Sequence, residues 1–240
     1  RDRDAIITEE GLIFRVIGCS HPSQAYFCDV EYAPATVFKS DEPKALRNRG
    51  QDVFYKFYDD EAWKFIGDDF PQYMILHELL HRKVIGVKRT AIREVRLPER
   101  VLTELAHAKP KDTLLAAMQS VLDTPTDNWG LPLGAFGVFG SLLHGFYHPS
   151  FSDIDLVIYG KENLTELRQA LMESYASESS PFRNEFETED SMKGKFWRFR
   201  NFTPKEFLWH QKRKLVYSLF DSGENGRTIK TEFEPVKSWP

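Results

Sequence analysis

Hydrophobic and polar positions alternate with a period of two along much of the first hundred residues, as is typical of β-strands. Residues 5–33 hold short apolar runs separated by turns, and they predict a β-hairpin or meander. Residues 53–58 fit a further strand. Residues 84–96 mix β-branched residues with Lys and Arg, which predicts strands or an extended linker.

The segments between these runs predict loop and helix. Residues 34–52 are polar and rich in basic residues, so we expect a loop. Residues 60–66 fit a short helical turn, and the apolar spacing of residues 70–82 predicts an amphipathic helix.

After about residue 97 the apolar positions recur mostly at helical spacing. Pro98 suits the first turn of a helix, and Asp112 is an expected N-cap for residues 113–122. Asn163 is the expected cap of a helix over residues 164–175, and residues 205–217 predict another.

Three apolar strands punctuate these helices, at residues 136–139, 153–159 and 227–236. The remaining segments, 124–134, 176–192 and 222–226, predict loops, a solvated stretch and a turn. The change of pattern near residues 96–98 predicts two domains: a small β-rich accessory domain at 1–96, and an α/β (α+β) domain with a mixed sheet at 97–240.

Composition narrows the class of protein only slightly. The chain of 240 residues is 41% hydrophobic and 28% charged, which is typical of a soluble globular protein. A net charge of −4 argues against a surface that coats nucleic acid, although not against a local basic groove. No apolar run is long enough to span a membrane and no signal peptide is evident, so we expect a cytoplasmic protein with no membrane partner. Cys19 and Cys28 fit two unpaired, buried thiols better than a disulfide.

The most informative chemistry is Gly140-Ser141 followed by Asp153-Ile154-Asp155. Because side chains alternate along a strand, both carboxylates point to one face and the apolar residues to the other. Two negative charges this close require a cation, and carboxylate oxygens suit Mg²⁺ or Mn²⁺. A Gly-Ser turn lets backbone N–H groups approach a phosphate. The motif therefore indicates metal-assisted phosphoryl or nucleotidyl transfer.

The run Phe139-Gly140-Ser141, then Ser152-Asp153-Ile154-Asp155-Leu156, resembles the motif of the DNA polymerase β-like nucleotidyltransferase superfamily. Residues 138–160 also resemble uncharacterised archaeal members that carry an N-terminal accessory domain. The resemblance implies transfer of a nucleoside monophosphate from a nucleoside triphosphate to a hydroxyl acceptor, with release of pyrophosphate. It implies that Asp153 and Asp155 bind two Mg²⁺ ions and that Gly140, Ser141 and Ser152 contribute to nucleotide binding.

A third carboxylate is expected from a later strand in this superfamily. Glu232 and Glu234 share one face of the last predicted strand, and we favour Glu232 as the third metal ligand and general base, with Glu234 as the alternative ligand. The superfamily more often has Asp at this position.

The acceptor is not readable from the sequence, and an RNA end, a small molecule and a protein hydroxyl all stay open. Basic residues alternate with aromatic ones between Lys193 and Phe202, and Lys212-Arg213-Lys214 follows on a predicted helix. Such clusters can hold phosphates and stack bases, but ordinary amphipathic elements look the same. For His144 and His148, a role in stabilising a turn is favoured over a contact with the triphosphate.

Two other functions stay open at this point. His77-Glu78-Leu79-Leu80-His81 matches H-E-x-x-H, so a zinc hydrolase is an alternative if these residues lie on one helix. A catalytically silent module that binds nucleotide or RNA is the other.

Overall fold

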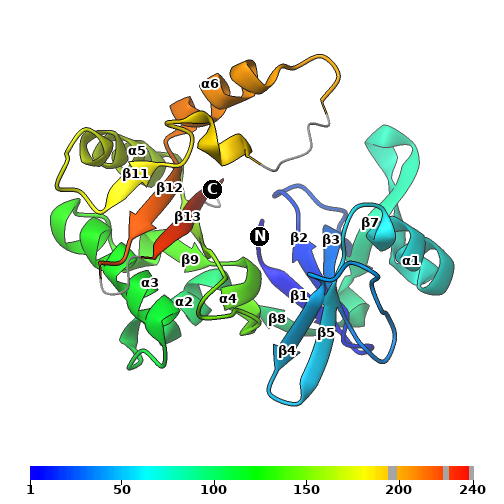
Figure 1. Ribbon diagram of the computed structural model, residues 1–240. Coiled ribbons are helices and arrows are strands. Elements are labelled where there is room, and N and C mark those ends of the chain that lie inside the picture. The colour runs from blue at the N-terminus through cyan, green and yellow to red at the C-terminus, as the bar shows by residue number, and fades with distance from the viewer. Residues whose placement is uncertain (194–198, 224–226, 238–240) are drawn as a thin grey trace. The chain divides into compact units, whose positions relative to one another are not determined.

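The computed structural model describes residues 1–193, 199–223 and 227–237 (Figure 1). The chain divides into two compact units. Unit 1 contains Arg1–Val101 and Leu143–Tyr147, and unit 2 contains Leu102–Leu142 and His148–Ser238. Both α-helices and β-sheets are present, one of the sheets being mixed, which confirms the predicted α/β (α+β) class.

Unit 1 is built on an antiparallel sheet, which an alternating sequence favours when one face is buried. The strand order is β4-β5-β3-β2-β1-β8, and β7 joins β3 while pairing with β6. The strands are β1 (Ala5–Thr8), β2 (Ile13–Val16), β3 (Ala25–Pro34), β4 (Leu46–Arg49), β5 (Asp52–Lys56), β6 (Met74–His77), β7 (Arg82–Lys88) and β8 (Ile92–Arg96). The strands predicted within 5–33, 53–58 and 84–96 are therefore confirmed, whereas the predicted loop at 34–52 contains β4.

Helix α1 (Glu61–Asp69) extends the helical turn predicted at residues 60–66. Its buried residues Phe65 and Ile66 join the core formed by the sheet, which includes Phe14 and Val30. Rings from several elements meet in this core, and Phe38 stacks on Phe57 with 4.2 Å between the centroids.

The helix predicted over residues 70–82 is wrong. The segment instead forms a 3₁₀ turn at Pro71–Tyr73, strand β6, a second 3₁₀ turn at Glu78–Leu80 and the start of β7. Tyr73 and Ile75, two residues apart, are both buried, and β6 pairs with β7 in register from Met74 opposite Ile85. The apolar side chains of this segment alternate with a period of two, which allows β6 to pair with β7 as a hairpin. This pattern prevails over the weaker helical spacing.

Unit 2 carries helices close to the predicted ones: α2 (Pro98–His107), which begins in unit 1, α3 (Thr113–Asp123), α5 (Lys161–Tyr175) and α6 (Pro204–Lys214). Asp112 caps α3 as predicted, since its carboxylate accepts from the backbone N–H groups of Leu114 and Leu115. The predicted cap at Asn163 is wrong, because α5 starts at Lys161 and the Asn163 side chain donates back to the Tyr159 carbonyl at 2.8 Å. No helix among the described residues is long and apolar enough to cross a membrane.

The sheet of unit 2 has the strand order β11-β12-β13-β10-β9. The strands are β9 (Phe136–Val138), β10 (Ile154–Tyr159), β11 (Phe182–Asn184), β12 (Tyr217–Asp221) and β13 (Thr228–Val236). Strands β10 and β13 run parallel and the other pairs are antiparallel, so the sheet is mixed. Helix α5 packs against β10 and β11, and α6 packs against β12.

Two predictions in this unit fail at the edge of the sheet. Residues 176–192 are not simply solvated, because they contain β11 and the buried side chains of Phe182 and Phe186. Helix α6 ends at Lys214 rather than 217, since Leu215 adopts a left-handed conformation at φ +66° and Tyr217 begins β12. Of the predicted turn at 222–226, residues 224–226 lie outside the described part.

Candidate active site

Strand β9 runs into the short helix α4 (Gly140–His144) at the Gly-Ser pair. Gly140 has φ +62°, and a Cβ at this position would collide with Oδ2 of Asp155. The neighbouring Phe139 N–H donates to the Asp155 carbonyl at 3.0 Å. Only glycine readily combines this positive φ with the absence of a Cβ. Glycine is therefore required at position 140 because the turn lies so close to the Asp155 carboxylate.

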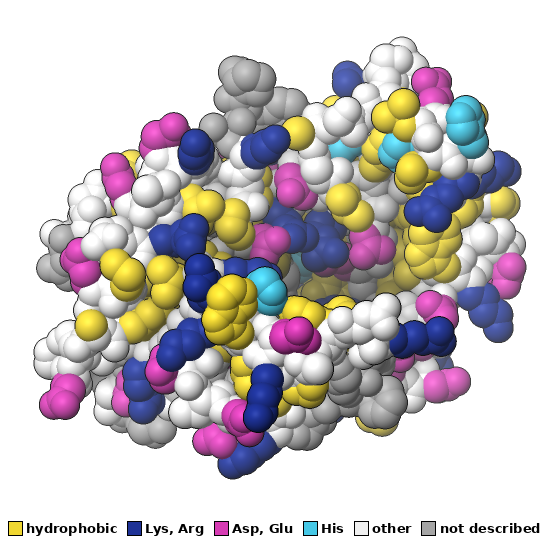
Figure 2. Space-filling model, turned by 90° about the horizontal axis from the view of Figure 1, so that it is seen from above, with side chains coloured by type: hydrophobic (Ala, Val, Ile, Leu, Met, Phe, Trp, Pro, Cys, Tyr) yellow, Lys and Arg dark blue, Asp and Glu magenta, His cyan; other side chains and the backbone are white. Residues whose placement is uncertain are grey.

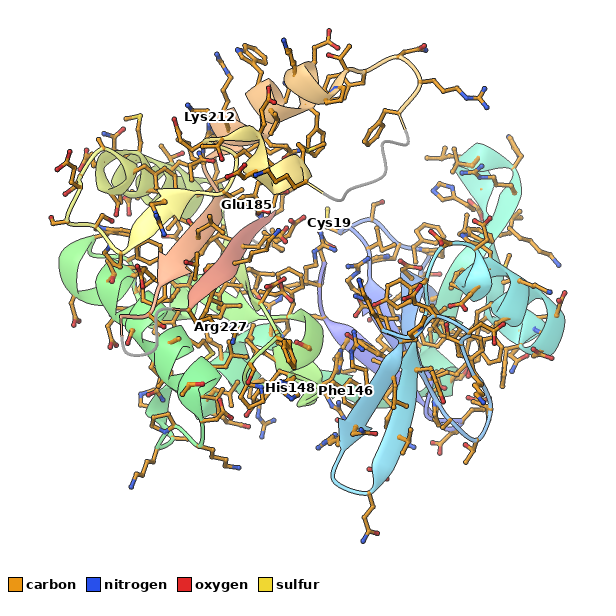
Figure 3. The ribbon with its side chains drawn as sticks, in the orientation of Figure 1. Cys19, Phe146, His148, Glu185, Lys212 and Arg227 are labelled. Carbon is orange, nitrogen blue, oxygen red and sulfur yellow. The ribbon has the colours of Figure 1, made fainter. Side chains whose placement is uncertain are left out.

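The loop before β10 is held by its own polar groups. The His148 N–H donates to Oγ of Ser152 at 2.8 Å, and the Ser150 N–H donates to Nδ1 of His148 at 3.1 Å. Arg227 donates to the carbonyls of Pro149 and of Ser152, the latter at 2.6 Å (Figure 3). These bonds position the chain that enters Asp153, and they give His148 the turn-stabilising role predicted for it.

Strand register brings several polar residues into one row across the sheet. Asp155 lies opposite Glu232 on β13, and Glu232 lies opposite Tyr217 on β12. Glu185, just after β11, extends the row because its N–H donates to the Tyr217 carbonyl at 3.0 Å. These residues line one cavity of about 200 Å³, hereafter the acidic cavity, whose walls are Asp153, Asp155, Glu185, Phe186, Tyr217, Lys230, Thr231 and Glu232.

Charges in the acidic cavity are only partly compensated. Lys230 forms an ion pair with Glu185. Partial burial raises the pKa of the Asp153 carboxyl, the positive charges of Lys230 and Arg227 lower it, and Glu185 raises it. Asp153 is partly desolvated and lines the same cavity as Asp155 and Glu232. Binding of an additional cation among these carboxylates is therefore favourable.

The donor set suits a hard divalent cation, because Asp153, Asp155 and Glu232 all line the acidic cavity and offer oxygen ligands. Within residues 1–193, 199–223 and 227–237, no three His, Cys, Asp or Glu side chains already form a metal-ligand cluster. Mg²⁺ is commonly held by one or two carboxylates together with substrate phosphates, so a site of this kind does not require three protein ligands that are already clustered.

Glu234 is not brought to this cavity. It lies opposite Val157, one step of alternation beyond the pair Asp155 and Glu232, and it lines a different pocket. The register therefore separates the two candidates for the third carboxylate and favours Glu232.

The H-E-x-x-H interpretation fails on geometry. His77 ends β6, Glu78 lies in a 3₁₀ turn and His81 is left-handed at φ +47°, so the two histidines do not share a helix face. His77 stacks on Phe27 with 4.6 Å between ring centroids. Because zinc-protease helices need both imidazoles on one face, the zinc hydrolase is dropped.

Sequence reasoning missed several residues of the site: Glu185, Phe186, Tyr217, Lys230 and Thr231 of the acidic cavity, and Arg227, which holds the loop before β10. Strand alternation could have found Lys230, which shares a face with Glu232, whereas Glu185 sits in a stretch interpreted as solvated. The alternating cluster after Lys193 falls partly at 194–198, outside the described residues, so Lys195 and Arg198 have no place in this account.

Comparison with known proteins agrees with this picture. Residues 126–218 match the family model described as "Nucleotidyltransferase domain". The chain is also 26% identical over 233 residues to an uncharacterised protein of Methanocaldococcus jannaschii, covering 92% of this chain and 65% of that protein. The chain thus spans about two thirds of the length of that relative. No solved structure matches the chain.

Proposed function

With a nucleotidyltransferase domain matched at residues 126–218 as the premise, we propose that this chain transfers a nucleoside monophosphate from a nucleoside triphosphate to a hydroxyl acceptor, releasing pyrophosphate. The observation that carries the proposal is the pairing of Asp155 with Glu232 on adjacent strands, with Asp153 lining the same cavity. A nucleotidyltransferase domain itself implies a transferase with a nucleotide substrate.

In this proposal Asp153, Asp155 and Glu232 hold Mg²⁺ or Mn²⁺. When bound, the ions would neutralise charge on the phosphates and orient the attack. The backbone at Gly140 and Ser141, beside Asp155, is proposed to contact the outgoing phosphates. Ser152 supports this site through the loop, since its hydroxyl accepts from the His148 N–H.

Glu232 is proposed to accept the proton of the acceptor hydroxyl. The hydroxyl oxygen bonds to the α-phosphorus, the bond from that phosphorus to the β-bridging oxygen breaks, and pyrophosphate leaves with the bonding electrons. Strand order supports a division of the site, because β9 with Gly140 lies on one side of β10 and β13 with Glu232 on the other. The donor phosphates then occupy the β9 side and the acceptor approaches from the β13 side.

The test is pyrophosphate release with each of the four nucleoside triphosphates and Mg²⁺ or Mn²⁺, in the presence of a mixture of RNA ends and small hydroxyl acceptors. We expect Asp153→Asn and Asp155→Asn to abolish release while circular dichroism and the urea unfolding midpoint stay near wild type. Substantial release by either variant would contradict the assignment.

A nucleotide-binding module without catalysis is the second candidate. It is favoured by the ion pair of Lys230 with Glu185, which places a positive charge of the protein itself at the acidic cavity. It predicts that the wild-type protein binds a metal-nucleotide complex with no release of pyrophosphate under any of the conditions above.

A further inference from the structure

A second, larger cavity lies in unit 2 beside the end of β13, and it shares Tyr217 with the acidic cavity. It has a volume of about 570 Å³ and is hereafter the basic pocket. Its polar lining comes from α5 (Arg168), the C-terminal half of α6 (His210, Arg213 and Lys214) and strands β12 and β13 (Tyr217 and Glu234). Figure 2 looks onto α6 from above and shows Lys and Arg side chains interspersed with hydrophobic ones over that helix.

The last turn of α6 is fixed by side chains from the elements around it. Asn184 donates to the Lys212 carbonyl at 2.9 Å, and Arg168 donates to the Arg213 carbonyl at 3.1 Å. The Tyr175 hydroxyl donates to the carbonyl of Leu215, the left-handed residue that ends the helix, at 2.7 Å. Carbonyls that have lost helical partners are thereby satisfied, so the pocket wall is held in place before a ligand arrives.

The charge of the basic pocket is mostly positive. Arg168, Arg213 and Lys214 face one carboxylate, Glu234. Arg213 lies over the Trp209 ring at 4.4 Å and Lys214 over the Tyr217 ring at 5.5 Å, and within the described chain neither forms an ion pair. Lys212, on the same turn, behaves differently, because it pairs with Glu187 at 2.6 Å and does not line the pocket. Basic residues near a helix C-terminus also stabilise the helix dipole, but that role does not require them to converge on a cavity.

The basic pocket adjoins the acidic cavity. Tyr217 lines both, and Glu232 and Glu234, two residues apart on one face of β13, line one each. Two residues of strand span roughly 7 Å, about the rise of two nucleotide steps along a nucleic-acid strand. The basic pocket therefore begins about two strand residues from Glu232, within reach of a ligand whose hydroxyl is directed at Glu232.

We propose that the basic pocket holds a phosphate group of the acceptor, so that the acceptor is a phosphorylated molecule whose hydroxyl reaches Glu232 from that anchor. This inference rests on the proposed function and specifies its acceptor. The chemistry recognised is a phosphate, which a nucleic-acid 3′ end or a small phosphorylated molecule could supply. Arg213 and Lys214 are the phosphate ligands, and Tyr217 offers a ring face beside them.

The test is equilibrium binding, which requires no turnover. The probes are a labelled ten-nucleotide single-stranded RNA, uridine 5′-monophosphate and ATP with Mn²⁺. We expect the double variant Arg213→Gln/Lys214→Gln to bind the RNA at least about tenfold more weakly, or the monophosphate if the acceptor is small, with ATP affinity unchanged. If RNA is the ligand, the slope of log affinity against log salt concentration should become shallower in the double variant, by the amount that corresponds to roughly two phosphate contacts. Lys212→Gln is the matched control and should behave as wild type.

Four outcomes would overturn the inference. The double variant could bind both phosphate probes as tightly as wild type does, or Lys212→Gln could lose as much probe affinity as the double variant. The double variant could also lose ATP affinity in parallel, or wild type could bind neither phosphate probe. A wild-type urea midpoint for the double variant excludes misfolding, and if it shifts, Lys214→Gln alone replaces it. Failure of the proposed function is seen separately, as absence of pyrophosphate release. In an active enzyme, the double variant should raise the acceptor KM and leave kcat near wild type.

Discussion

At the scale of single residues, a few positions in the site leave no choice of side chain. Gly140 is the clearest, because both its φ of +62° and its proximity to Asp155 exclude a Cβ. The sequence could predict Gly140, Asp153 and Asp155, because they form a local motif. It could not predict Glu185, which reaches the acidic cavity only through strand pairing with Tyr217.

Gly140→Ala is therefore expected to displace the Asp155 carboxylate and to slow pyrophosphate release about a hundredfold or more, since small misplacements of catalytic groups have effects of that size. Backbone strain should cost only about 1–2 kcal/mol of stability. Gly134→Ala is the matched control, because its added methyl meets nothing within 4 Å. Equal activity of the two variants would contradict the steric argument.

His144 should make stability depend on pH. It is buried in unit 1, where desolvation, followed by the charges of Arg96 and Arg49, lowers its pKa to about 3. Arg96 is also 3.2 Å from its Nδ1, and Glu31 lies 4.0 Å from its Nε2. The unfolded chain takes up a proton near pH 6.5 and the folded chain does not, so this residue destabilises the fold as pH drops from about 6.5 towards 3.

The expected size of this effect is about 2 kcal/mol between pH 7 and 5. Burial raises the pKa of Glu31, so that residue acts in the opposite sense when the folded protein gains its proton. Urea unfolding at both pH values should show a smaller loss of stability in His144→Gln than in wild type. The exposed His107→Gln is the control, and an unchanged pH dependence in His144→Gln would refute the assignment.

At the scale of elements, local sequence signals predicted most boundaries, and tertiary pairing decided the rest. The cap at Asp112 and the strand at 227–236 needed only local spacing. The segment at 70–82 became a hairpin because Ile75 and its neighbours pair with β7, and residues 176–192 contain β11 because β12 offers an edge. Such pairing joins residues distant in sequence, which a single chain's periodicity does not report.

Asp112→Ala tests whether the local signal carries the stability assigned to it. The variant loses the bonds to the N–H groups of Leu114 and Leu115, both 3.0 Å long, and should lower the free energy of unfolding by about 1 kcal/mol. Urea unfolding measures this directly. Lys111→Ala, an exposed neighbour, should change stability by less than about 0.5 kcal/mol. Equal urea unfolding midpoints for Asp112→Ala and Lys111→Ala would show that the cap contributes no stability and would contradict the prediction.

At the scale of the whole molecule, the mixed sheet is what turns separate motifs into a site. The parallel pairing of β10 with β13 sets Asp155 beside Glu232 and moves Glu234 into the basic pocket. From the sequence these two glutamates were nearly equivalent, since they share a face of one strand. Their register against another strand distinguishes them. The division of the chain into domains at 1–96 and 97–240 stays a prediction, as do the roles of the site residues.

Because Glu232 and Glu234 differ only in their position along β13, they directly test which glutamate takes part in transfer. Transfer of an α-labelled nucleotide in Mg²⁺ or Mn²⁺ should be measured for wild type, Glu232→Gln and Glu234→Gln, which make the same chemical change on the same face of β13. We expect a loss of transfer of about a hundredfold or more in Glu232→Gln and near wild-type kcat in Glu234→Gln. Equal transfer by the two variants, or greater loss in Glu234→Gln, would contradict this expectation.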